Sequence, residues 1–142
     1  MEEAGGIARE GRRGIYRPVG TVTLDEAVRL VGEAITAARS ARIDGLLADI
    51  TGLTGFDPPD TFQRFRAIEA WVEAAAGRVC LAVVAPPEMI DPRKFGVTVA
   101  SNRGMVSNIF ADEDEALAWL DALLRTPGPT AAESIPAPGT AA

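Results

Sequence analysis

Apolar residues recur along the first half of the chain at the spacing of an amphipathic helix. Between residues 24 and 38 they occupy one helical face, at Leu24, Val28, Val31, Ile35 and Ala38. Thr23 and Glu26 stand at the start of this run, three residues apart. A threonine and a glutamate at this spacing can form a capping box, in which each side chain bonds the other residue's backbone amide. We therefore predict a helix that ends near residue 41.

Shorter apolar runs predict strands. Three such runs cover residues 45–50, 79–85 and 105–110. Pro86 and Pro87 end the second run, because proline has no amide hydrogen to donate to a sheet. Nearer the N-terminus, residues 7–9 and 14–17 flank a glycine turn and predict a hairpin.

Three more helices are predicted from helix-start signals. Asp57-Pro58 offers an N-cap followed by a proline suited to the first helical position. The apolar face of this second helix would hold Phe62, Phe65, Ile68, Val72 and Ala75. Asp91-Pro92 repeats the signal for a third helix that runs to about residue 103, and residues 112–115 form another capping box before a fourth.

Strands that alternate with helices at these spacings predict a single α/β domain over residues 1–125. Its sheet would be mixed and mostly parallel, with the N-terminal hairpin on its antiparallel side and about four helices around it. Sites in such sheets lie at the carboxyl ends of the strands, here the loops after residues 50, 85 and 110. Residues 126–142 hold four of the ten prolines and one large apolar residue, Ile135, so we predict a Pro/Ala-rich disordered tail.

Charge and composition exclude several classes of function. The 142 residues include 20 acidic and 14 basic side chains, a net charge of −6 that argues against a nucleic-acid partner. There is no histidine and one cysteine, which excludes the usual catalytic triads and cysteine-based zinc sites. We expect no enzymatic activity, no cofactor and no metal.

The start MEEAGG does not read as a secretory signal, and the apolar runs are far shorter than the ~20 residues of a membrane-spanning helix. We expect a cytoplasmic protein.

Three short segments carry a resemblance to a known family. They are GTVTLDEA at residues 20–27, LADITGL at 47–53 and FADEDEALAWL at 110–120. These segments look like small bacterial STAS/SpoIIAA-like proteins, relatives of anti-sigma-factor antagonists that are sometimes grouped with lipid-binding SEC14-like domains. The resemblance covers roughly residues 7–125. It implies a STAS-like fold and a regulatory module that acts through protein–protein contacts.

The best-known members of that family carry a phosphorylatable serine at the start of their second helix. When Asp49-Ile50-Thr51 is aligned with the first part of their pattern, Pro58 falls at the serine position, and proline has no hydroxyl. The resemblance therefore implies no switch at this position, and we expect no regulatory phosphorylation at the neighbouring Thr54 and Thr61. What carries over is a docking surface for a protein partner, formed by Thr51, Thr54, Phe56, Asp57, Pro58, Asp60, Thr61 and Arg64.

A small-ligand or lipid-binding module is the alternative hypothesis. It would hold a small apolar molecule in a pocket between the sheet and the helices, with ligand-binding residues Phe62, Phe65 and Phe95. Exposed basic residues of the helices, such as Arg64, are typical of solvated faces. They could still bind an anion if two such faces met near a strand-end loop. A homodimer is left open.

The remaining chemistry-bearing residues favour structural roles. Asp49, Asp57 and Asp60 suit caps or docking better than acid–base catalysis. Cys80 lies inside an apolar strand, where thiols usually pack, and Trp71 and Trp119 fall on or beside apolar helix faces.

Overall fold

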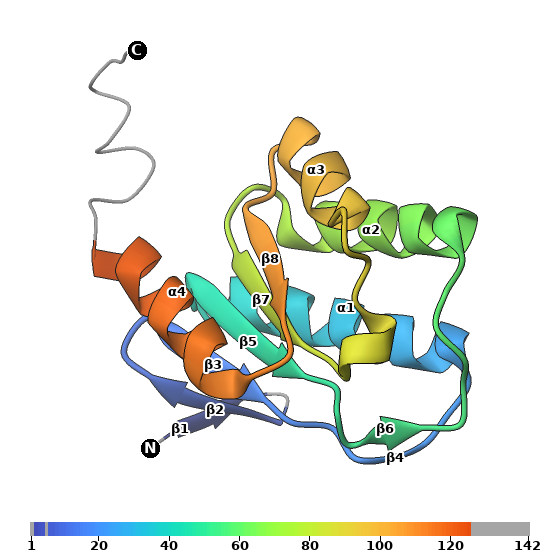
Figure 1. The fold of residues 1–142 in the computed structure, drawn as a ribbon. Helices are drawn as coiled ribbons and strands as arrows, with labels where there is room; N and C mark the ends of the chain where they lie inside the picture. Colours follow the sequence, from blue (N-terminus) through green and yellow to red (C-terminus); the bar gives the residue numbers. More distant parts are fainter. Residues whose placement is uncertain (1, 5, 126–142) are drawn as a thin grey trace.

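The computed structural model describes residues 2–4 and 6–125. Within these ranges one six-stranded sheet has the order β1-β2-β3-β5-β7-β8 (Figure 1). Its strands are β1 (Glu2–Ala4), β2 (Ile7–Glu10), β3 (Arg13–Tyr16), β5 (Gly45–Asp49), β7 (Cys80–Val84) and β8 (Ser107–Phe110). The first three strands pair antiparallel, and β3, β5, β7 and β8 pair parallel. The predicted mixed, mostly parallel sheet with an N-terminal hairpin is confirmed. The strand β1 was not predicted.

Helices cover both faces of the sheet. The four α-helices of the described residues are α1 (Leu24–Ser40), α2 (Thr61–Ala75), α3 (Phe95–Asn102) and α4 (Glu113–Arg125). The first three lie on one face and α4 on the other (Figure 1). Successive residues of β7 serve the two cores in turn, since Leu81 and Val83 pack beneath α1 and α2, whereas Ala82 and Val84 pack beneath α4. The number of helices agrees with the sequence prediction.

The start of α1 follows the predicted capping box. The Glu26 amide donates to the Thr23 hydroxyl oxygen at 3.1 Å, and the Thr23 amide donates to a Glu26 carboxylate oxygen at 2.9 Å. The helix ends at Ser40, close to the predicted residue 41.

The predicted start of the second helix at Asp57 is wrong. Asp60 is the N-cap of α2, and its carboxylate accepts from the Gln63 amide at 2.8 Å while the Gln63 side chain accepts from the Asp60 amide at 2.9 Å. The reason lies in the two adjacent prolines. A residue that precedes proline is disfavoured in the helical conformation, so Pro58 cannot open a helix while Pro59 follows it. Residues 56–60 therefore run outside any helix or strand.

The third helix also begins later than predicted. A short 3-10 helix, η1 (Pro87–Met89), follows β7, and α3 starts only at Phe95. Asp91 still contacts the start of this helix, because its carboxylate accepts from the Arg93 amide at 3.2 Å and from the Phe95 amide at 2.9 Å. Lys94 takes a left-handed conformation (φ 50°) at the N-cap position, which places the helix start after the proline turn.

Two very short strands, β4 (Gly20–Thr21) and β6 (Leu53–Thr54), form a separate parallel pair that was not predicted. This pair holds the loop after β5 against the segment that leads into α1. Gly55 follows it with φ +104°, and a Cβ atom at this position would lie 2.6 Å from the carbonyl oxygen of Val22.

No helix within the described ranges is long and apolar enough to cross a membrane. The predicted tail, residues 126–142, lies outside the described residues.

Candidate functional site

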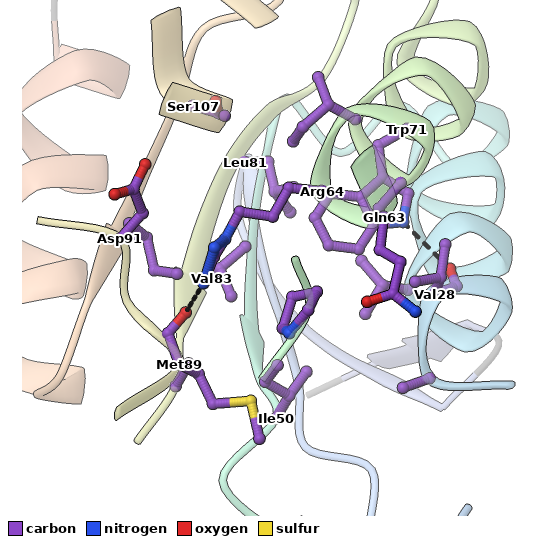
Figure 2. Close-up of a pocket in the computed structure, with 18 of the residues that line it drawn as sticks. Val28, Ile50, Gln63, Arg64, Trp71, Leu81, Val83, Met89, Asp91 and Ser107 are labelled. Carbon is purple, nitrogen blue, oxygen red and sulfur yellow. Dashed lines mark hydrogen bonds between the residues drawn. The ribbon is translucent and has the colours of Figure 1, made fainter. Parts of the chain in front are cut away.

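A cavity lies between the sheet and the helices α1 and α2, near the carboxyl ends of β5 and β7 (Figure 2). Its volume is about 130 Å³. Most of its lining is apolar and includes Val28, Ile50, Ile68, Trp71, Leu81 and Val83. These residues come from α1, the end of β5, α2 and β7. An apolar pocket between the sheet and the helices was the basis of the ligand-binding alternative.

Small residues keep this space open. Ala27 on α1, Ala67 on α2 and Gly96 on α3 all line the cavity. Gly96 allows α3 to approach α2 closely, because a Cβ atom there would lie 3.3 Å from the side chain of Ile68. Trp71 fixes the opposite wall: its indole Nε1 donates to the carbonyl oxygen of Val28 at 3.0 Å and so joins α2 to α1. The cavity is thus framed by helices that are fastened to one another.

Arg64 crosses the cavity. Its side chain leaves α2 and reaches η1, where Nη2 donates to the carbonyl oxygen of Met89 at 3.1 Å (Figure 2). The residue is half-buried. Asp91 also lines the cavity, and the hydrogen bonds from the backbone amides of Phe95 and Arg93 lower the pKa of its carboxyl group, with a smaller contribution from the charge of Arg64. Asp91 is therefore ionised at neutral pH.

Lys94 and its hydrogen-bond partner Asn108 both contribute to the lining. The Nζ atom donates to the side-chain oxygen of Asn108 at 2.8 Å and lies 5.4 Å from the centre of the Phe110 ring. Phe110 belongs to the core beneath α4, on the other face of the sheet. The charge of Lys94 is thus held at strand β8.

Six residues of the predicted docking surface are exposed beside this cavity: Thr51, Thr54, Asp57, Pro58, Asp60 and Thr61. The other two, Phe56 and Arg64, are half-buried and line the cavity itself. The Thr54 hydroxyl lies 3.3 Å from that of Thr21, across the β4–β6 pair. The role of the eight docking-surface residues in binding a partner stays a prediction.

The three predicted ligand-binding phenylalanines lie outside the lining of the cavity. Phe62 is 67% exposed, and Phe95 is 37% exposed. Phe65 packs under the guanidinium of Arg103, 5.1 Å from the ring centre. The face of α2 that meets the cavity instead carries residues 64, 67, 68 and 71. This face is hard to predict as a cavity wall because it mixes an arginine and an alanine with its apolar residues. The i, i+3, i+4, i+7 spacing was the available signal.

The carboxylate of Asp49 accepts hydrogen bonds from the loop after β5. One of its carboxylate oxygens accepts from the Thr51 amide at 3.0 Å and from the Thr51 hydroxyl at 2.6 Å. On the α4 side of this loop, Arg17 donates two hydrogen bonds to Glu113, at 2.9 and 2.7 Å. These bonds are the main cause that lowers the pKa of Glu113. Hydrogen bonds thus hold the start of this loop, and the structural role expected for Asp49 stays a prediction.

The other polar side chains considered for chemistry do not come together in one site within the described residues. Among the residues that the structure describes, no group of three or more Cys, Asp and Glu side chains is placed to hold a metal ion. Cys80 is half-buried, and burial is the main cause that raises the pKa of its thiol.

Comparison with known proteins adds no assignment: no protein-family model and no curated protein matches the chain.

Proposed function

We propose that this chain is a non-enzymatic binding module that takes a small apolar ligand into the cavity beneath α2. The observation that supports this proposal is an apolar space of about 130 Å³, framed by two helices and the sheet. An apolar cavity of about 150 Å³ is known to bind benzene, so the size suits a ring or a chain of about six carbons. The sequence had favoured protein contacts, and the cavity moves the ligand alternative to first place.

The size of the cavity also limits the affinity. Small ligands gain at most about 1.5 kcal/mol per non-hydrogen atom, and most gain far less. For a ligand of about eight such atoms we expect dissociation constants between roughly a micromolar and a millimolar. A ligand in this range exchanges readily, which is suited to sensing a metabolite whose concentration changes.

The test uses a neutral apolar probe, toluene, and nuclear magnetic resonance of the full chain. Saturable shifts should appear at backbone amides of β7 and α2. Val83 lines the cavity, so the Val83→Phe variant should lose these shifts because the ring occupies the space. The matched control is Val84→Ile on the opposite face of the same strand, which should bind toluene as the wild type does. Absence of saturable binding, or equal binding by Val83→Phe, would overturn the proposal.

We propose second that the exposed segment beside the cavity docks a protein partner. Phe62 is 67% exposed in the first turn of α2, and the exposed Asp57 and Pro58 precede that helix in the chain. The resemblance to STAS/SpoIIAA-like proteins supports this proposal. In a pull-down from the source cell, the Phe62→Ser, Asp57→Arg double variant should lose a partner that the wild type retains. Val106→Ser, which changes an exposed apolar residue before β8, is the control and should retain it. A partner that all three proteins retain equally would contradict this second proposal.

A further inference from the structure

The cavity contains one cation whose hydrogen-bonding capacity is largely unused. We propose that the ligand of this cavity is a small monocarboxylate, with its tail of about six carbons among the apolar side chains and its carboxylate on the guanidinium of Arg64. This inference rests on the proposed function and names the chemical class of its ligand. The argument has three steps: the position of Arg64, the state of its donors, and the charge around it.

Arg64 lies beside the position that the carboxylate of such a ligand would take. Figure 2 shows its side chain passing from α2 over Val83 towards Met89, so the guanidinium borders the apolar space. Arg64 is part of the cavity lining, and the residue is half-buried. A charged hydrogen bond at such a site is screened by water less than one on an exposed face.

The donors of Arg64 are only partly used. A guanidinium carries five N–H donors in a planar fork. The bond from Nη2 to the Met89 carbonyl oxygen, at 3.1 Å, is the one side-chain hydrogen bond that Arg64 makes within the described part of the chain. Arg64 is also absent from every ion pair found among these residues. A carboxylate matches the fork because its two oxygens can accept two parallel bonds.

The surrounding charge favours a single negative charge. The charged side chains that line the cavity, counted over the described residues, are Arg64, Asp91 and Lys94. The Lys94 ammonium is held by Asn108 and Phe110, and the Asp91 carboxylate accepts from two backbone amides of the α3 start. With one of its five N–H donors bonded, Arg64 is the cation with the larger capacity left for a ligand. The ionised Asp91 would repel a second negative charge, so a monocarboxylate is favoured over a dianion.

A purely structural role for Arg64 is the competing explanation. The bond to Met89 fastens η1 to α2, and a fastening residue would affect every ligand alike. The two roles differ in how they respond to the charge of the ligand. Three probes of equal tail length separate them: hexanoate, hexan-1-ol and hexylammonium. Each is titrated into the full chain at constant ionic strength, with backbone amide shifts as the readout.

The wild type should bind hexanoate about 10-fold or more tightly than hexan-1-ol, because a hydrogen bond to a charged group exceeds a neutral one by about that factor. Hexylammonium should bind most weakly. Arg64→Gln should lose about tenfold or more of the hexanoate affinity while hexan-1-ol binding stays nearly unchanged. Arg66→Gln is the matched control on the same helix; its guanidinium lies over the exposed Phe62 ring at 5.9 Å, and hexanoate affinity should not change.

The outcomes distinguish this inference from the proposed function. If hexan-1-ol binds as tightly as hexanoate, or if Arg64→Gln weakens both probes equally, the carboxylate assignment is wrong while the apolar site stands. If none of the three probes binds and toluene also fails, the proposed function is wrong as well. Should Arg64→Gln not fold, the comparison of hexanoate with hexan-1-ol on the wild type still decides the matter.

Discussion

Replacing Val83 by phenylalanine tests whether the cavity beneath α2 persists in solution. Val83 is 6% exposed on β7 and faces the cavity, whereas its neighbour Val84 is 2% exposed and faces α4. The same substitution at the two positions adds the same four carbons to opposite faces of one strand. The ring at position 83 has an unfilled space to enter. The ring at position 84 meets a packed core.

The magnitude follows from the volume of the cavity. At about 24 cal/mol per Å³ for an enclosed cavity, a space of 130 Å³ lowers the free energy of unfolding by at most about 3 kcal/mol. This is the most that Val83→Phe can recover. Overpacking costs about 1–3 kcal/mol where no space exists. We expect Val83→Phe to be as stable as the wild type or up to about 2 kcal/mol more stable, after rotamer strain and lost side-chain entropy. We expect Val84→Phe to lose about 1–3 kcal/mol or to fail to fold.

Urea unfolding, followed by the fluorescence of Trp71 and Trp119, measures the difference. The two variants should differ by about 3 kcal/mol in their free energies of unfolding, or by roughly 10 °C in Tm for a domain of this size. The m-values should match that of the wild type, since both variants expose similar surface on unfolding. If Val83→Phe loses as much stability as Val84→Phe, the space is closed in solution, and the basis for ligand binding is removed.

Three further results are expected. The Arg17 hydrogen bonds lower the pKa of Glu113 below its ordinary 4.5, so their stabilisation is present above about pH 4.5 and is lost as the pH falls through the pKa of the folded state. The free energies of unfolding of Glu113→Gln and the wild type, measured with urea, should therefore differ slightly at pH 7, by roughly 0.5 kcal/mol, and converge in acid; a constant gap would contradict this. Gly55→Ala should lose about 2 kcal/mol more than Gly104→Ala, since both have positive φ but only Gly55 meets a backbone carbonyl, at 2.6 Å; equal losses would refute the close approach. Burial raises the pKa of the Cys80 thiol, so iodoacetamide should alkylate it more slowly in the native protein than in urea, and equal rates would show that it is accessible.

Local signals predicted the elements of this fold well. The Thr23–Glu26 capping box and the run over residues 79–85 are short-range patterns, and each gave the correct element because no competing pattern overlapped it. The start of α2 was missed because two signals competed within four residues. Asp57 with Pro58 and Asp60 with Gln63 are both good helix starts. The second proline decides between them, and its effect on the residue before it outweighs the preference of proline for the first helical turn.

The cavity could be predicted only in outline. A pocket between sheet and helices follows from the fold class, but its lining depends on how α2 is rotated over the sheet. The large apolar residues of α2 suggested that Phe62 and Phe65 would face inward. In the structure the face with Arg64, Ala67 and Trp71 meets the cavity, because α2 packs against both α1 and α3. Such a choice between two helix faces depends on tertiary contacts that no short segment encodes.

The pairing of β3 with β5 has a consequence for the growing chain on the ribosome. The β2–β3 hairpin is local and can close within about 1–10 μs. Its partner strand β5 is separated from β3 by the whole of α1, and at about 5–20 residues per second those 28 residues take roughly one to six seconds to synthesise. The edge of β3 is open to other chains for that time. Arg13 places a charge on this edge, paired first with Glu10 of the same hairpin, which hinders premature pairing. Its second partner, Asp121 at 2.8 Å, belongs to α4 and is synthesised only when the domain is nearly complete.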